Sequence, residues 1–437
     1  MAAAPLPFPC ALTGGFEYFG NNESGGAVEK TILVVGTYDT KQDELFYLAG
    51  VIETQGGRAL RMDVSVLGDP VAPVEYSKHR VVKEAGGTIA AAIALGDENT
   101  AMQMMADGAA ALAGRLYREG RFDGVVVLGG TMGTDLALDL CRALPLGVPK
   151  YIVSTVAFSP IIPPERLAAD TQMILWSGGL YGLNSVCKSS LSQAAGAVLG
   201  ATRAVEKPKF DRPLVGMTSL GKTALTYMVA LKPALEERGF EVAVFHSTGM
   251  GGRAFESLAA QGAFACVMDF CTQELGNHIH GSAISAGADR LSAAGRNRTP
   301  QIVAPGCYDL VDIVGWQEVP KKWCDHRLHA HNRLLSSVVL NHDERREVAR
   351  AHASRLAQAK GPTAFVLPTG GLGEWDRQGA DLHDPGGLAV FVAEMTAVMP
   401  ENVELTLLDG HINDQSFVDK ALEIFDGWCA DGTVKTS

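Results

Sequence analysis

Short apolar runs alternate along this chain with longer stretches in which apolar residues recur at helical spacing. The first run, at residues 31–36, is rich in β-branched residues and ends at a glycine, as expected of a parallel strand buried on both faces. Leu45, Leu48 and Ile52 then follow one helical face until two glycines stop the pattern. This alternation predicts parallel sheets whose strands are joined by right-handed helical crossovers.

Two series of such elements are predicted. The first series has strands at 31–36, 59–66, 124–128, 151–156 and 173–176, and helices after residue 40, at 99–120 and at 184–205. The second has strands at 214–218, 241–246, 263–269, 301–304, 363–367 and 403–408, and helices at 222–238, 252–260, 344–360, 387–398 and 415–428. The second half therefore repeats the alternation of strands and helices seen in the first half.

A charged, proline-bearing stretch at residues 206–213 separates the two series, and we predict the domain boundary there. Residues 29–205 would form an N-terminal Rossmann-like subdomain, and residues 214–437 a C-terminal one. Residues 1–28 lack a periodic pattern and are interrupted by prolines and glycines, so we expect a flexible tail. The predicted fold class is α/β, with two tandem Rossmann-like subdomains built on mainly parallel sheets.

Composition narrows the possible partners. A net charge of −12 argues against nonspecific binding to nucleic acid or to an anionic membrane, because both need a cationic surface. No apolar run approaches the 18 residues of a transmembrane helix. The 8 cysteines are scattered without a Cys-x-x-Cys pair, and we expect a cytoplasmic protein with reduced thiols.

The loop after the first strand gathers groups that suit a nucleotide or sugar. Open α/β sheets place ligands at the carboxyl ends of their strands. Threonine hydroxyls in this loop could bind phosphate or sugar oxygens, with the lysine as counter-charge, whereas the alternative is that Asp39 and Thr40 only cap the next helix. The candidate binding residues here are Gly36, Thr37, Asp39, Thr40 and Lys41.

The glycine-rich loop at residues 129–134 is a candidate anion cradle. Glycines allow the backbone to approach a ligand closely, and the helix that follows directs its first N–H groups toward it. The sequence differs from G-x-G-x-x-G, and a tight turn between strand and helix is the alternative. The candidate binding residues are Gly129, Gly130, Thr131, Gly133 and Thr134.

Residues 216–223 match the P-loop pattern G-x-x-x-x-G-K-T, between a predicted strand and a predicted helix. A P-loop NTPase also needs an acidic residue on a second strand for Mg²⁺, and Asp269 is the only candidate partner. The match is local, so it favours phosphate contact over a P-loop NTPase mechanism. The candidate binding residues are Thr218, Gly221, Lys222 and Thr223.

A second glycine-rich loop of the C-terminal half follows His246. Its arginine could hold a phosphate or a carboxylate with two hydrogen bonds. The candidate binding residues are Ser247, Thr248, Gly249, Gly251, Gly252 and Arg253. His246, Asp269 and His411 are the acid–base candidates, although a histidine at a strand end is as often a structural donor. No metal-ligand spacing occurs, so no metal site is predicted.

Several runs together resemble a known family. They are TILVVGTYDTK, GGTMGT, VFHSTGMGGRAFESL, SAGADRLSAAGRNRTPQIVAPGCYDLVDI, the pair His331-Asn332, and HINDQSF. In this order, over about residues 30–430, they resemble the uncharacterised protein family that includes the ATP-binding N-terminal domain of the tomato mosaic virus resistance protein. The resemblance implies two Rossmann-like subdomains, bound ATP and a homodimer. The family's shared loops fall on residues 36–41, 129–134, 246–253, 370–371 and 411–414 of this chain.

These inferences lead to two hypotheses. The first is an ATP-binding protein, with Mg²⁺ as a possible companion, whose ligand lies in a glycine-lined cleft between the subdomains. The second is a hydrolase or lyase that acts on a small anionic metabolite in the same cleft. The expected partners are a nucleotide or small anion and a second copy of the chain, with no nucleic acid and no membrane.

Overall fold

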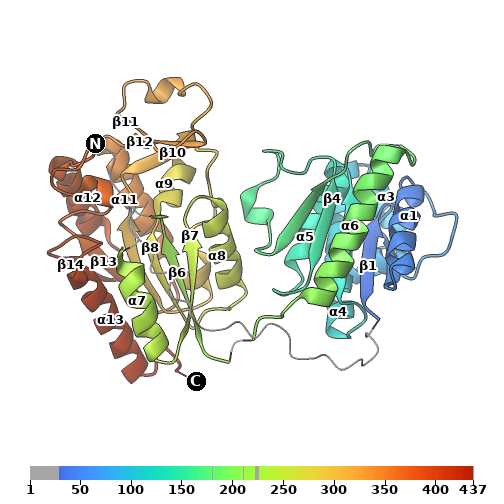
Figure 1. The fold of residues 1–437 in the computed structure, drawn as a ribbon, viewed down its shortest axis with the longest axis horizontal. Coiled ribbons are helices and arrows are strands. Elements are labelled where there is room, and N and C mark those ends of the chain that lie inside the picture. The colour runs from blue at the N-terminus through green and yellow to red at the C-terminus, as the bar shows by residue number, and fades with distance from the viewer. Residues whose placement is uncertain (1–28, 180, 210, 222–225, 437) are drawn as a thin grey trace, which may run out of the picture.

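A computed structural model describes residues 29–179, 181–209, 211–221 and 226–436. It shows two α/β subdomains side by side, with the N-terminal one in blue to green and the C-terminal one in light green to red (Figure 1). Residues 205–209 leave the last helix of the first subdomain without forming helix or strand. The predicted fold class is therefore confirmed.

The N-terminal subdomain is built on a five-stranded parallel sheet. Its strands, in the spatial order β2-β1-β3-β4-β5, are β1 (Thr31–Gly36), β2 (Arg58–Asp63), β3 (Gly124–Gly129), β4 (Lys150–Ser154) and β5 (Thr171–Leu175). The chain builds outward from β1 to β2 on one side, then continues from β3 on the other. The strand order thus reverses between β1 and β3, where sheets of this type form a crevice at their carboxyl ends.

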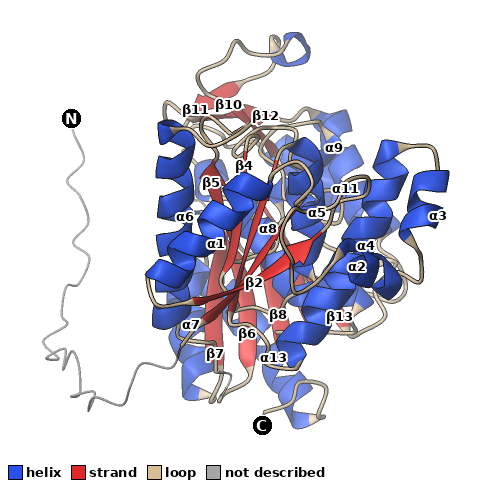
Figure 2. Cartoon of the chain, turned by 90° about the vertical axis from the view of Figure 1, so that its right-hand side faces the viewer, coloured by secondary structure: helices blue, strands red, loops and turns tan. Residues whose placement is uncertain are grey.

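Alternation along β1 explains why helices cover both faces of this sheet. Ile32 and Val34 pack with α1 (Gln42–Thr54) and α6 (Ser185–Ala204). Leu33 and Val35 point the other way, into a core shared with α2 (Lys78–Glu84), α3 (Ile89–Ala94), α4 (Glu98–Arg118) and α5 (Thr131–Arg142). Figure 2 shows helices on both sides of the strands.

The C-terminal subdomain repeats this arrangement. Its six parallel strands, in the order β14-β13-β9-β8-β6-β7, are β6 (Leu214–Ser219), β7 (Glu241–His246), β8 (Cys266–Cys271), β9 (Gln301–Gly306), β13 (Thr363–Pro368) and β14 (Glu404–Leu408). The helices are α7 (Thr226–Glu237), α8 (Met250–Ala260), α9 (Gln273–Ile279), α10 (Ala293–Arg296), α11 (His342–Leu356), α12 (Pro385–Val398) and α13 (Gln415–Ala430). The order again reverses between its first and third strands.

A small antiparallel sheet at the top of the C-terminal subdomain is absent from the predicted pattern (Figure 1). It consists of β10 (Leu310–Val314), β12 (Leu335–Val339) and β11 (Leu328–Ala330). Residues 315–334, which we call the arm, connect β10 to β12 and include β11 and the short helix η3 (Lys321–Trp323). Two other single-turn helices are η1 (Pro164–Arg166) and η4 (Glu374–Asp376).

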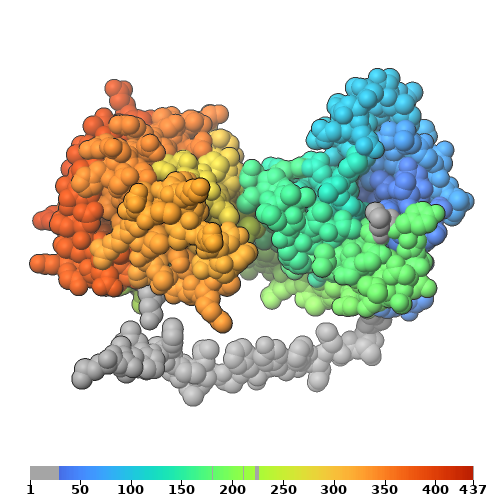
Figure 3. Space-filling model, turned by 90° about the horizontal axis from the view of Figure 1, so that it is seen from above, coloured from blue at the N-terminus to red at the C-terminus, as the bar shows by residue number. Residues whose placement is uncertain are grey.

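The two subdomains touch, as Figure 3 shows from above. Leu146 and Ala169 of the N-terminal subdomain pack against an apolar cluster of the C-terminal one that includes Phe255 and Phe264. A β-carbon placed on Gly287 would lie 2.8 Å from Cβ of Glu165, the middle residue of η1 (Pro164–Arg166). This contact has no room for a side chain at Gly287.

The predicted strands all exist, within three residues of their predicted ends. Helix α7 is described from Thr226, and residues 222–225 lie outside the described part of the chain. In the described ranges, no helix is long and apolar enough to cross a membrane. A cytoplasmic location stays a prediction.

Candidate functional site

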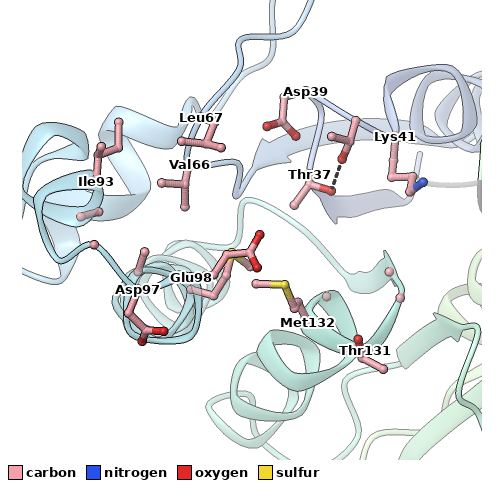
Figure 4. Close-up of a pocket in the computed structure, with 18 residues that line it drawn as sticks. Thr37, Asp39, Lys41, Val66, Leu67, Ile93, Asp97, Glu98, Thr131 and Met132 are labelled. Carbon is pink, nitrogen blue, oxygen red and sulfur yellow. Dashed lines mark hydrogen bonds between the residues drawn. The ribbon is translucent and has the colours of Figure 1, made fainter.

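A cavity of about 460 Å³ opens at the carboxyl ends of β1 and β3 (Figure 4). It lies at the point where the strand order of the N-terminal sheet reverses, which is where open α/β sheets bind ligands. The lining residues come from five segments: Thr37, Asp39, Thr40 and Lys41; Val66 and Leu67; Ala92 and Ile93; Gly96, Asp97, Glu98, Ala101 and Met102; and Gly129, Gly130, Thr131, Met132 and Gly133.

The loop after β1 forms one polar wall of the cavity. The Thr37 and Thr40 hydroxyls lie 3.1 Å apart, and the backbone N–H of Lys41 donates to the Thr37 carbonyl at 2.9 Å. Asp39 fixes the neighbouring loop after β2, because its Oδ2 accepts the N–H of Gly68 at 3.1 Å. The hydroxyls and the lysine therefore lie on a short turn that is fixed by hydrogen bonds.

The start of α5 forms the facing wall. A β-carbon on Gly129 would lie 2.5 Å from Cα of Gly133, so only glycine allows this tight entry into the helix. The N-cap residue is Gly130, and no side chain caps the helix. The first N–H groups of an α-helix lack partners within the helix, so those at Thr131 and Met132 can serve a ligand anion.

The far end of the cavity is largely apolar. Val66 and Leu67 follow β2, and Ala92 and Ile93 belong to α3. Leu67 is 74% exposed and Ile93 is 48% exposed, so both present apolar surface at the cavity. In Figure 4 the Glu98 carboxylate points between Thr37 and Met132. The cavity therefore suits a ligand with one anionic end and one apolar end.

Sequence reasoning found the polar walls and missed the apolar end. Thr37, Asp39, Thr40, Lys41, Gly129, Gly130, Thr131 and Gly133 line the cavity, and their binding of a ligand stays a prediction. Gly36 lies beneath the loop, where a β-carbon would meet the Leu45 side chain at 2.8 Å. Thr134 is buried, and its hydroxyl donates to the Gly130 carbonyl. None of the described lining residues comes from the C-terminal subdomain, so this cavity differs from the predicted interdomain cleft.

In the C-terminal subdomain, the predicted anion position at the start of α8 already holds a carboxylate. Glu274 Oε1 accepts the N–H groups of Gly249 at 2.6 Å and of Gly252 at 3.1 Å. A β-carbon on Gly252 would lie 1.8 Å from Glu274 Oε2, so glycine is what admits this side chain. Since Glu274 uses these N–H groups, a phosphate cannot bind them in this arrangement.

Glu274 belongs to a buried cluster around Arg290. The guanidinium contacts Asp269 through Nη1 at 2.5 Å and Nη2 at 2.7 Å, Glu274 through Nε at 2.8 Å, and Glu256 through Nη1 at 3.2 Å. All four side chains are buried. Burial raises the pKa of Glu274 to about 7 and also raises the pKa of Glu256, because the charged carboxylates lose their water.

The other candidate residues of these loops are held by internal contacts. The Thr218 hydroxyl donates to Asp269, and Arg253 pairs with Asp289. Ser247 is buried, and a β-carbon on Gly251 would overlap the His246 carbonyl at 1.8 Å. Gly221 has a φ of 48°, whereas Lys222 and Thr223 lie outside the described residues.

The three acid–base candidates do not line the cavity. Asp269 is paired with Arg290. His411 Nδ1 accepts the N–H of Asn413 at 3.0 Å, so its Nε2 carries the proton and lies 3.0 Å from Asp376. His246 ends β7, with Nδ1 3.4 Å from the Thr248 hydroxyl. Across the described ranges, no group of three or more histidine, cysteine or acidic side chains is placed to hold a metal ion.

Two family models match this chain, one over each subdomain. The profile described as "Uncharacterised protein family (UPF0261) N-terminal domain" matches residues 30–207, and the corresponding C-terminal domain profile matches residues 212–429. The chain belongs to the UPF0261 family. Within UPF0261, the boundary between the two profiles falls in the segment that joins the two sheets.

Relatives of this UPF0261 chain occur in bacteria and in a plant. A UPF0261 protein of Brucella melitensis is 52% identical over 403 residues, which cover 92% of this chain and 96% of that protein. A UPF0261 protein of Clostridium tetani is 33% identical, covering 89% and 96%. The ToMV resistance protein Tm-1 of Solanum lycopersicum is 27% identical, covering 90% of this chain and 55% of the plant protein. The expected family resemblance is confirmed.

Proposed function

We propose that this chain binds ATP in the cavity between the β1 loop and the start of α5. The observation that carries the proposal is the uncapped N-terminus of α5 at the reversal point of the sheet. Backbone N–H groups and the helix dipole there favour a phosphate, in a chain whose net charge is −12. The family resemblance points to the same ligand.

Each part of the cavity suits one part of ATP. The phosphates fit the N–H groups of α5 and the Lys41 ammonium, and the ribose hydroxyls fit the Thr37 and Thr40 side chains. The adenine ring fits the apolar end at Leu67 and Ile93. Mg²⁺ would enter with the phosphates, where Asp39 and Glu98 make the wall acidic.

Isothermal titration with ATP, ADP and AMP tests this function. We expect binding of ATP with one site per chain and an about tenfold weaker affinity for the Lys41→Ala variant, because one charge-assisted contact is lost. Arg58→Ala, which removes an exposed cation away from the cavity, is the matched control. Absence of heat from ATP with folded protein would reject the function, and heat from a sugar acid or keto acid alone would favour the hydrolase or lyase.

We also propose a homodimer that forms through the arm. Trp316 is 70% exposed and Leu334 is 72% exposed, and they are close together because the N–H of Gly315 donates to the Leu334 carbonyl. The arm also carries exposed Lys321, Arg327 and Arg333, whereas the chain as a whole is acidic. The acidic surface of a second copy is therefore complementary to it.

Light scattering after gel filtration tests the dimer. The native chain should have twice the mass of one chain, and the Trp316→Ser variant should shift toward the mass of one chain, since the arm loses its largest apolar contact. Val229→Ser removes an apolar side chain that is 65% exposed on α7 and is the matched control. A native chain with the mass of a monomer, or equal dissociation in both variants, would contradict this assignment.

A further inference from the structure

A second cavity, of about 650 Å³, lies at the opposite end of α4 and α5. The carboxyl ends of both helices contribute to it, near the amino ends of β3 and β4. Its lining consists of Gly114, Tyr117, Arg118, Gly120, Phe122, Asp123, Arg142, Ala143, Leu144, Pro145, Lys207 and Gln261. Helix α4 has 21 residues and is thus about 30 Å long, so this cavity is separate from the first.

This cavity carries an excess of positive charge, although the chain as a whole is acidic. Among its described lining residues are the cations Arg118, Arg142 and Lys207 and one carboxylate, Asp123. Asp123 is already engaged, because Oδ1 accepts from Lys30 Nζ at 3.2 Å and Oδ2 accepts the N–H of Thr31 at 3.0 Å. The cations of the cavity are therefore in excess over the carboxylates that could neutralise them.

Among the described residues, neither arginine of the cavity has an internal partner. In the part of the chain that the structure describes, the guanidinium groups of Arg118 and Arg142 make no ion pair and no hydrogen bond. Nearby arginines behave differently. Arg115 pairs with Glu84 and Glu119, and Arg203 donates to the carbonyls of Gln55 and Gly56.

Arg118 lies beside the end of α5. A β-carbon on Gly114 would be in ordinary van der Waals contact with both Arg118 Nη1, at 3.5 Å, and the Ala143 carbonyl, at 3.6 Å, which places the exposed guanidinium next to the last turn of α5. Arg142 occupies the last turn of α5. The two arginines thus converge from neighbouring helices, which pack together along their length.

The cavity also includes the connection between the subdomains. Lys207 follows α6, and its Nζ lies 3.1 Å from the Tyr117 hydroxyl. Gln261, after α8, belongs to the C-terminal subdomain. A ligand here would touch both subdomains and the segment that joins them, and domain boundaries are preferred places for ligand sites.

We propose that this second cavity binds a small multivalent anion, of the phosphate or polycarboxylate class. Guanidinium groups bind such anions with paired hydrogen bonds, and the Lys207 ammonium adds a third charge. The tyrosine and the carbon stems of the arginines would cover the ligand's apolar part. The alternative is that both arginines only offset the negative ends of the helix dipoles.

Inorganic pyrophosphate, titrated calorimetrically at constant ionic strength, is the probe for this site. We expect one saturable site in the native chain and an at least tenfold loss of affinity in the double variant Arg118→Ala/Arg142→Ala, because two charged donors are removed. The double variant Arg58→Ala/Arg121→Ala removes the same charge from exposed positions outside the lining and is the matched control. Circular dichroism and thermal melting establish that each variant is folded.

Pyrophosphate could also enter the first cavity, so the titration is repeated with Lys41→Ala. Retained binding in Lys41→Ala together with loss in the arginine variant supports the proposal. Loss in Lys41→Ala alone, equal loss in the control, or absence of heat in the native chain would overturn it. An arginine variant that melts earlier while the native chain binds no pyrophosphate would assign the arginines to helix stabilisation. None of these results depends on whether ATP binds the first cavity.

Discussion

Replacing Arg290 with alanine should lower the free energy of unfolding by about 3 to 5 kcal/mol, the range measured when one partner of a buried ion pair is removed. Without the guanidinium, Asp269, Glu256 and Glu274 would remain buried together without a cation. Urea unfolding followed by tryptophan fluorescence measures this loss. It should appear in the C-terminal subdomain, which contains all four side chains.

The matched control is Arg296→Ala, which removes an exposed arginine six positions further along the chain and should change the free energy by less than about 0.5 kcal/mol. The loss caused by Arg290→Ala should also shrink from pH 7.5 to pH 5. Arg290 lowers the pKa of Glu274, which burial raises to about 7 in the native chain, so removing Arg290 raises this pKa further. The variant therefore takes up more protons in its folded state than the native chain does across that interval, and a neutral carboxyl is less costly to bury. Equal losses in both variants would contradict the central role of Arg290.

Replacing Thr131 with glutamate should stabilise the fold while weakening ATP binding by about a hundredfold or more. A carboxylate in the first turn of α5 interacts favourably with the helix dipole, by about 0.3 to 1 kcal/mol. The same charge lies where we place the phosphates, so it repels the nucleotide and competes for the N–H groups. Thermal melting and calorimetric titration with ATP measure the two effects.

Thr131→Gln is the control, since it has the size of glutamate without the charge and should retain most of the affinity. Thr131 is exposed, so both side chains can be accommodated. The design imitates the C-terminal subdomain, where Glu274 already occupies the start of α8. If Thr131→Glu bound ATP as tightly as the native chain, the phosphates would have to lie elsewhere.

The strands could be predicted because buried parallel strands appear in a sequence as apolar runs. Val125, Val126 and Val127 illustrate this, since all three are fully or almost fully buried between helices on both faces. The short helices α2 and α3 were missed because two turns carry little periodic signal. The antiparallel sheet was missed because β11 has only three residues and β10 pairs with β12 across the long arm.

The candidate site could likewise be predicted only in part from the sequence. Glycines and threonines marked the two loops of the first cavity, but its apolar end comes from the loop after β2 and from α3, whose positions depend on packing. The sequence predicts ligand contacts at four loops. The structure separates them, because Glu274 lies only two residues into α9 and nothing in its local sequence indicates that it reaches the start of α8. A contact between a charged side chain and groups far away in the sequence produces no periodic pattern in the sequence.

The single segment that joins the two sheets also bears on how the protein is made. All strands of the first sheet precede residue 176, and all strands of the second follow residue 213. Each sheet can therefore form without a strand from the other half. At the usual synthesis rate, the ribosome needs roughly 10 to 45 seconds to add the remaining residues. The first half, with its candidate nucleotide cavity, can thus fold while its companion is still being translated.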